Sequence, residues 1–263
     1  MHKVLINDNF VRTDLILELN PSIDKQETIY NKNIKIIESN QDGHNYTTIK
    51  YDDITDNDSY SDIEKIFITK LKKYLKPAKK DIFLIIGLGN SKSTPDSLGP
   101  KTIDYIIPTR YLFEFGDVEE GYSCVASYTP NVIGNTGIES ISIIKGIIKD
   151  IKATKLIIID SLKASNLDRL VKTIQITDKG IFPGSGINNN RGEISKKTTK
   201  CDVIAIGVPT VVDINSIINN KDNPSFIVTP TNIDFVIDKL SKLIGECINI
   251  TLHKNINRQI NSK

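Results

Sequence analysis

Two aspartates that follow buried apolar runs are the residues of this chain best suited to do chemistry. Asp96 lies in a Gly-rich segment that comes directly after the apolar run 82–86, and Asp160 follows the apolar run 156–159. They are 64 positions apart (160 − 96), but in an open parallel sheet the functional crevice lies beyond the carboxyl ends of the strands. We therefore expect both carboxylates at the same edge of the sheet.

A close pair of carboxylates can hydrolyse a peptide bond without histidine or a metal ion. Like charges in a low dielectric do not both ionise cheaply, so one member of such a pair holds a proton. The ionised oxygen can polarise a water molecule, while the protonated one supplies a proton to the leaving amine. The alternative is that each aspartate only caps a helix or forms a turn. Asp213 ends a segment that follows the apolar run 203–206 and is a third candidate on the same grounds.

Other chemistries find little support in the residue types available. Of the three histidines, two lie near the ends of the chain and His44 sits in a polar turn. The three cysteines are far apart and form no metal-ligand or disulfide pattern, so we expect three buried thiols. The Gly87/Gly89 pair lacks the third glycine of a dinucleotide fingerprint, and Gly184-Ser185-Gly186 lacks the glycine that opens a nucleophile elbow. We therefore expect acid–base work to fall to carboxylates, lysine or tyrosine, with no metal or cofactor.

Composition bounds the class of protein. The chain has 263 residues, of which 25% are charged and 39% hydrophobic, which is typical of a folded globular protein. Lys plus Arg number 34 and Asp plus Glu number 32, so the formal net charge of +2 provides no global signal for nucleic acid or an anionic membrane. No apolar stretch approaches 18 residues, and none near residue 1 resembles a signal peptide. We expect a soluble, cytoplasmic protein.

Residues 1–79 are expected to form an arm, a hairpin and a helix attached to the rest of the chain. The stretch 1–33 is polar and irregular in pattern. Two strands and an amphipathic helix follow. These elements are strands 34–37 and 46–51, the Asp42-Gly43 turn between them, and a helix that begins at a capping box at 61–64 and ends before Pro77.

From residue 80 onward, apolar runs alternate with amphipathic segments of helical length. The expected strands are 82–86, 124–126, 156–159, 171–177 and 203–206. The expected helices are 98–113, one that a capping box at 136–139 opens, and a final one that Thr229-Pro230 caps. Runs that are apolar throughout suit strands buried on both faces of a parallel sheet. The pattern predicts an α/β sandwich with a mainly parallel sheet.

Ordered sequence blocks over most of the chain match a known family. The blocks are 11–15 (VRTDL), 87–90 (GLGN), 94–101 (TPDSLGPK), 109–114 (TRYLFE), 136–139 (TGIE), 159–162 (IDSL), 183–186 (PGSG), 205–213 (AIGVPTVVD) and 228–230 (VTP). In these blocks the chain resembles the germination proteases of endospore-forming bacteria, which are endopeptidases that degrade small acid-soluble spore proteins. The resemblance implies an atypical aspartic peptidase whose catalytic aspartates are Asp96 and Asp160. It also implies a three-layer α/β/α sandwich similar to that of hydrogenase maturation proteases.

The resemblance further implies a zymogen that cuts itself near its N-terminus. The processing bond would lie next to Asp14, close to Leu15, and would release a propeptide of residues 1–14. The peptidase domain would then be 15–263, with the arm, hairpin and helix in 15–79 and the α/β core in 80–263. Members assemble as homotetramers in the developing spore, which places this chain in the spore core with small acid-soluble spore proteins as substrates.

A cleft is expected beside the two aspartates, and two other functions remain open. The expected cleft-lining residues are Gly89, Asn90, Gly184, Ser185, Gly186, Pro209, Thr210 and Asp213. One alternative is a maturation-type factor of the same fold that uses the two carboxylates to hold a metal ion, because hard cations prefer oxygen ligands. The other is a binding module whose turns hold an anion at helix N-termini.

Overall fold

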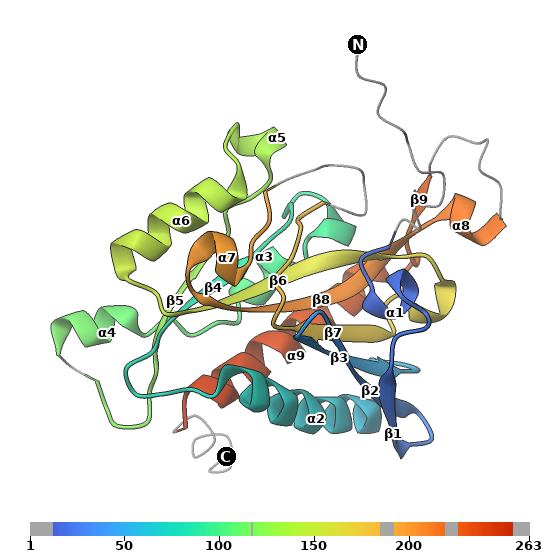
Figure 1. The fold of residues 1–263 in the computed structure, drawn as a ribbon, viewed down its shortest axis with the longest axis horizontal. Coiled ribbons are helices and arrows are strands. Elements are labelled where there is room, and N and C mark those ends of the chain that lie inside the picture. Colours follow the sequence, from blue (N-terminus) through green and yellow to red (C-terminus); the bar gives the residue numbers. More distant parts are fainter. Residues whose placement is uncertain (1–12, 117, 185–191, 219–225, 255–263) are drawn as a thin grey trace.

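One large sheet forms the centre of the protein (Figure 1). The computed structural model describes residues 13–116, 118–184, 192–218 and 226–254, and within these ranges the sheet has nine strands. Their order is β1-β2-β3-β7-β8-β6-β4-β5, and β9 pairs with β8. The strands are β1 (Lys25–Asn31), β2 (Ile34–Gln41), β3 (His44–Tyr51), β4 (Ile82–Gly87), β5 (Cys124–Tyr128), β6 (Lys155–Ala164), β7 (Thr173–Thr177), β8 (Asp202–Asp213) and β9 (Ile227–Val228).

The strand that carries Asp160, the strand that precedes Asp96 and their neighbours form a parallel unit. β4 pairs in parallel with β5 and β6, and β6 pairs in parallel with β8. Antiparallel strands extend this unit, because β7 pairs with β8 and the hairpin of β2 and β3 joins through β3 and β7. The N-terminal hairpin is therefore part of the same sheet as the α/β core.

The predicted hairpin turn is confirmed. β2 ends at Gln41 and β3 begins at His44, so the loop consists only of Asp42 and Gly43. Their φ angles are 54° and 79°. A two-residue loop of this kind requires a positive φ at both positions, and Asp-Gly adopts it with little strain.

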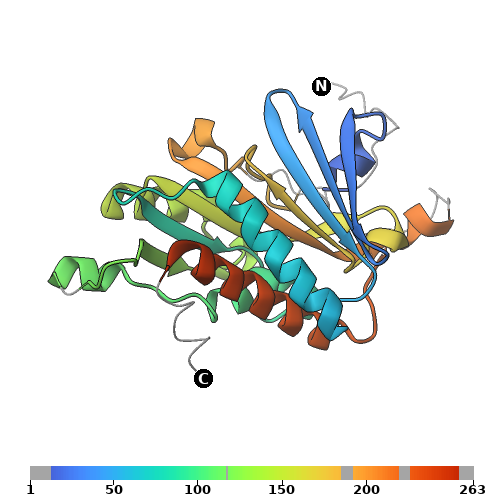
Figure 2. The ribbon, with the colours of Figure 1, turned by 90° about the horizontal axis from the view of Figure 1, so that it is seen from below.

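Helices cover both faces of the sheet and complete a three-layer α/β/α sandwich (Figure 2). Helices α2 (Asn57–Leu75) and α9 (Ile233–Leu252) lie side by side on one face, and α6 (Ser140–Ile151) covers the other. Alternate residues of β4 pack into two separate apolar clusters, the odd-numbered ones with α2 and α9 and the even-numbered ones with α6. Because both faces are covered, this strand is a continuous apolar run in the sequence.

Short helices complete the connections between the strands. They are α1 (Ile16–Leu19), α3 (Leu98–Ile103), α4 (Arg110–Phe115), α5 (Ile133–Thr136), α7 (Lys196–Thr199), α8 (Ile214–Ile218) and two 3-10 turns, Thr94–Asp96 and Leu167–Arg169. Within the described ranges, no helix combines the length and the apolar character needed to cross a lipid bilayer.

The single helix predicted over 98–113 is wrong, because two helices occupy that stretch. Helix α3 ends at Ile103 and α4 begins only at Arg110. Pro108 lies between them and accounts for the break, since proline has no N–H to donate and disfavours a helical conformation in the residue before it. The apolar spacing continues through the break, which is why periodicity alone suggested one helix.

The predicted helix starts are also corrected. The observed N-caps are Asp56 for α2, Glu139 for α6 and Asn232 for α9. The Asp56 carboxylate accepts a hydrogen bond from Ser59 N at 2.8 Å, so this cap lies before the capping box predicted at 61–64. The second predicted capping box does not form, since Gly137 adopts a φ of 71° and ends α5 instead.

Strand boundaries differ from the prediction at both ends of the sheet. The described part of the stretch expected to be irregular, 13–33, contains α1 and β1, and nearly every β1 side chain is exposed, so no apolar alternation marks that strand. β6 and β8 continue to Ala164 and Asp213 because the two strands pair along this extension. Asp160 and Asp213 therefore lie within strands rather than after them.

The end of α9 contains a buried histidine. His253 is fully buried, and its Nδ1 accepts a hydrogen bond from Ser123 N at 3.4 Å while its Nε2 lies 3.3 Å from the carbonyl oxygen of Ile107. These partners fit a neutral ring with its proton on Nε2. Burial lowers the pKa of His253 from its ordinary value, and the contact with Ile107 opposes this shift in part.

Acidification is therefore expected to destabilise the fold through His253. The unfolded chain takes up a proton near pH 6.5 and the folded chain only at lower pH, so stability falls as the pH drops below about 6.5 until it passes the lowered folded pKa. The slope is at most about 1.4 kcal/mol per pH unit for one proton. Urea unfolding between pH 7.5 and 5 should show a steeper loss in the wild type than in His253→Gln. Equal pH dependence in the two proteins would contradict this assignment.

Candidate active site

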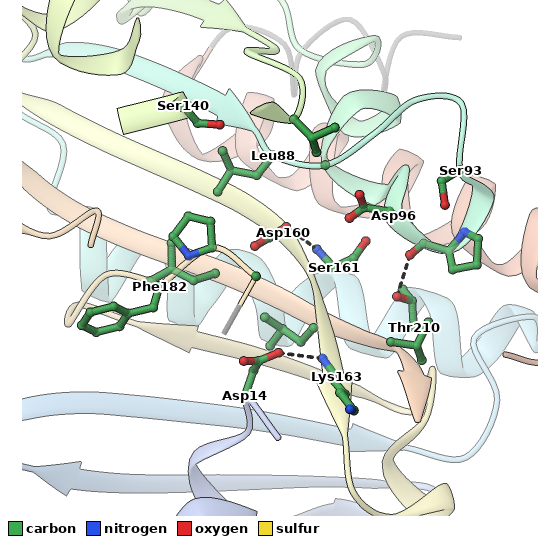
Figure 3. A pocket seen from close by; sticks show the side chains of 18 of the residues that line it. Asp14, Leu88, Ser93, Asp96, Ser140, Asp160, Ser161, Lys163, Phe182 and Thr210 are labelled. Carbon is green, nitrogen blue, oxygen red and sulfur yellow. Dashed lines mark hydrogen bonds between the residues drawn. The ribbon is translucent and has the colours of Figure 1, made fainter. Parts of the chain in front are cut away.

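Asp96 and Asp160 line one cavity of about 320 Å³, which lies beyond the carboxyl end of β4 and beside the middle of β6 (Figure 3). Its wall combines the segment after β4, the middle of β6, the 181–184 segment and Thr210 of β8. Figure 3 shows the side chains of Asp96 and Asp160 on one side of this space and Asp14 opposite them. Two carboxylates that are distant in sequence thus line one space, although Asp160 lies within β6 and not after it.

Backbone hydrogen bonds and one side chain of β8 hold the turn that carries Asp96. Asp96 N donates to the carbonyl oxygen of Ser93 at 2.8 Å, and the carbonyl oxygen of Asp96 accepts from Asn90 N at 2.9 Å. The Thr210 hydroxyl donates to the carbonyl oxygen of Pro95 at 2.6 Å. The position of this carboxylate is therefore tied directly to β8.

Glycines allow the Asp96 turn and α3 to pack backbone against backbone on the strands. Gly89 has a φ of 118°, and a Cβ there would collide with the carbonyl oxygen of Asp96. A Cβ on Gly99 would lie 2.5 Å from Leu88 N and 2.7 Å from the carbonyl oxygen of Ile159. Those two atoms form a 2.8 Å hydrogen bond that joins the end of β4 to β6, next to Asp160. Because Gly89 and Gly99 have no side chains, the Asp96 turn can pack directly against the strands, next to Asp160.

Asp160 is buried within β6, in register with Gly207 of β8. Its Oδ1 accepts a hydrogen bond from Ser161 N at 2.9 Å. The Ser161 hydroxyl oxygen is buried and has no hydrogen-bond partner in the described part of the chain. A buried hydroxyl of this kind is available to a bound group in the cavity.

Asp14 belongs to the wall of the same cavity because the N-terminal arm pairs with β6. Asp14 N donates to the carbonyl oxygen of Lys163 at 3.0 Å, and the Asp14 carboxylate accepts from Lys163 N at 2.9 Å. Leu15 is buried against Leu162 and Ala164. Both residues predicted to flank the processing bond therefore lie against the strand that carries Asp160.

Glu18 anchors the other end of the arm. One of its carboxylate oxygens accepts from Ser165 N at 2.8 Å and from the Thr13 hydroxyl. The other lies 3.4 Å from Arg169 Nε in a largely buried ion pair. With Asp14 bonded to β6 and Glu18 to the segment directly after it, the arm is held at two points, one on each side of Leu15.

Asp213 has a structural partner instead of a place in the cavity wall. Its carboxylate lies 3.0 Å from Lys163 Nζ, and both side chains are buried. Lys163 itself lines the cavity. Breaking a buried ion pair leaves an uncompensated charge, so the two residues depend on each other.

The predicted cleft residues divide into three groups. Gly89, Gly184 and Thr210 line the cavity. Asn90, Pro209 and Asp213 lie outside its wall, and Asn90 instead organises the turn, since its side chain accepts from Lys92 N at 3.0 Å. Ser185 and Gly186 fall outside the described residues.

Within the described ranges, metal-ligand groupings and activated thiols find no support. No three His, Cys, Asp or Glu side chains gather there in a way that could hold a metal ion. Burial raises the pKa of the Cys201 and Cys247 thiols, which disfavours the nucleophilic thiolate. Cys124 is partly exposed rather than buried as expected, and the pKa of its thiol is also raised, chiefly by desolvation.

Comparison with known proteins points to one family. A family model described as "Germination protease" matches residues 24–223. A germination protease from Clostridium acetobutylicum is 35% identical over 268 residues, which cover 82% of this chain and 82% of that protein. One from Bacillus subtilis is 35% identical over 274 residues, which cover 88% of this chain and 74% of that protein. One from a Geobacillus species is 40% identical over 209 residues, 77% of this chain but only 53% of that protein.

Solved structures include a more distant neighbour. A NiFe hydrogenase maturation protease from Thermococcus kodakarensis aligns over 68% of this chain and 99% of its own. The TM-score is 0.40 and the sequence identity 15%.

Proposed function

The chain belongs to the germination protease family and is a protease of that family, and we propose that it is an aspartic-type endopeptidase in which Asp96 and Asp160 share the acid and base roles. The observation that carries the proposal is the single cavity that both side chains line. Two carboxyl groups that approach each other closely in a partly buried cavity favour sharing a proton over ionising together. The pair then contains one base and one acid.

In the proposed reaction, water adds to the carbonyl carbon of a peptide bond. The ionised carboxylate takes a proton from the water, and the protonated carboxyl group supplies one to the leaving amine nitrogen. The carbon–nitrogen bond breaks, and the products are a carboxyl group and an amine. The buried Ser161 hydroxyl beside Asp160 is a further polar group that can contact the substrate in this cavity.

We extend the proposal to self-processing between Asp14 and Leu15. Three features support self-processing at this bond. Asp14 lines the same cavity as Asp96 and Asp160, and Leu15, the next residue, is buried. Hydrogen bonds between Asp14 and Lys163 hold this part of the arm on β6. Cleavage there would release residues 1–14 and leave a protease domain that begins at residue 15. The remaining parts of the proposal rest on family membership: small acid-soluble spore proteins as substrates, a homotetrameric assembly, and a location in the spore core.

The test is intact-mass analysis of the purified full chain during incubation, together with cleavage of a purified small acid-soluble spore protein. We expect a product that begins at Leu15 and fragments of the spore protein. A chain that keeps its N-terminus and leaves the spore protein intact would contradict the proposal. Cleavage that EDTA stops and a divalent cation restores would instead favour the metal-dependent alternative.

A further inference from the structure

Gln175 is a buried polar residue in the middle of β7. Its neighbours Ile174 and Ile176 belong to the main apolar core, and its own side chain points to the opposite face. A buried carboxamide is costly unless its donor and acceptor are both satisfied. The contacts that satisfy Gln175 come from the N-terminal arm, about 160 positions away in sequence.

The Gln175 side chain bridges Leu15, from the carbonyl oxygen of the Asp14–Leu15 peptide bond to the N–H of the next peptide bond. Its Oε1 accepts a hydrogen bond from Ile16 N at 2.9 Å, and its Nε2 donates to the carbonyl oxygen of Asp14 at 3.4 Å. These partners determine which end of the Gln175 carboxamide is the oxygen, because the N–H of Ile16 must face an acceptor and the carbonyl oxygen of Asp14 must face a donor. One carboxamide therefore holds the arm on both sides of Leu15.

The same peptide unit is held from its other side. Leu15 N donates to the Thr13 hydroxyl at 3.1 Å. The carbonyl oxygen and the N–H of the Asp14–Leu15 peptide thus each have a side-chain partner. A hydrogen-bond donor at the carbonyl oxygen also favours the negative charge that develops there when water adds to the carbon.

We propose that Gln175 is a positioning residue for self-processing, which selects the Asp14–Leu15 bond and holds it for cleavage. This inference rests on the proposed function, since it needs a protease that cuts its own arm. In the step, water adds to the carbonyl carbon of Asp14, the bond to Leu15 N breaks, and Leu15 N takes a proton. Gln175 loses its contact with the Asp14 carbonyl oxygen when the released segment leaves and keeps its contact with Ile16 N.

The variants Gln175→Met and Gln175→Glu separate the two contacts. Methionine has nearly the same shape and neither hydrogen bond, and glutamate keeps the acceptor for Ile16 N but places a second oxygen against the carbonyl oxygen of Asp14. We expect both to process about 10- to 100-fold more slowly, the effect of losing positioning hydrogen bonds, and to give mixed N-termini from cuts at neighbouring bonds. The readouts are the rate and the position of the cut by intact mass.

Thr173→Val is the matched control. Thr173 lies two positions before Gln175 on the same face of β7, and its hydroxyl is buried without a hydrogen-bond partner in the described ranges. Its variant should process at the wild-type rate to a single N-terminus at Leu15.

Two further measurements separate positioning from a general loss of structure. The melting temperature and the cleavage of a spore protein by the fully processed variants should change much less than the processing rate. Wild-type processing rates and a single cut in both Gln175 variants would overturn the inference, as would a parallel fall in processing, spore-protein cleavage and melting temperature. A wild type that cuts spore protein but not the Asp14–Leu15 bond would overturn the inference and the proposed self-processing, and would leave the proposed endopeptidase activity intact. A wild type that cuts neither would overturn the proposed function as a whole.

Discussion

Asp96→Asn and Asp160→Asn are each expected to lower self-processing and spore-protein cleavage by roughly 10³-fold or more. An amide has nearly the shape of a carboxyl group but can neither take a proton from water nor give one to the leaving amine. Removal of one member of a catalytic unit costs about as much as removal of the whole unit. The double variant should therefore cleave no more slowly than the slower of the two single variants. The rates are measured by intact mass for processing and by fragment yield for the spore protein.

The control for these variants is Asp150→Asn. Asp150 is an exposed carboxylate on α6, outside the cavity wall, so its variant should keep wild-type rates in both assays. Unchanged melting temperatures for Asp96→Asn and Asp160→Asn would show that the loss is chemical. Undiminished cleavage by either of them would remove that residue from the mechanism.

Gly99→Ala is expected to destabilise the protein by about 3 kcal/mol or more and to abolish cleavage. The added methyl group would enter the space next to the hydrogen bond between Leu88 N and the carbonyl oxygen of Ile159. The atoms that it would meet are backbone atoms, which cannot rotate away as a flexible side chain can. The α3 backbone would have to move away from β4 and β6, and the Asp96 turn would move with it. Urea unfolding and the spore-protein assay measure the two effects.

Gly146→Ala provides the opposite control. Gly146 lies inside α6, where an added Cβ would meet nothing within 4 Å. Alanine in an exposed helix interior is more favourable than glycine, so this variant should be more stable by roughly 0.5–1 kcal/mol with unchanged activity. Equal stability of the two variants would mean that close backbone packing at Gly99 is not what limits substitution there.

Local patterns determined the core of the fold. The apolar run in β4 predicts a strand covered on both faces, because alternate residues pack into separate clusters under helices on either side. The Asp42-Gly43 pair predicts the hairpin loop, because these residues adopt a positive φ at low cost. The same local reasoning led from Asp96 and Asp160 to one end of the parallel strands, and both residues line one cavity, although Asp160 lies within β6.

Where elements begin and end depended on their neighbours in space. β1 is a strand because it pairs with β2, although its exposed residues show no alternation. β6 and β8 extend past their apolar runs because they pair with each other, which places Asp160 and Asp213 within strands. Strand propensity and hydrophobic periodicity cannot predict which strands pair, because they depend only on residues a few positions apart in the sequence.

The details of the candidate site were decided by tertiary contacts. The sequence alone offers two carboxylates and an arm, but only the folded chain places Asp14 in the same cavity through its bonds to Lys163. Asp213 becomes the partner of Lys163, and Gln175, a buried polar residue in the middle of β7, becomes the partner of the arm. These contacts join residues 50 to 161 positions apart. No local periodicity encodes such distant partners, because they are selected by the pairing of buried polar groups once the layers have closed.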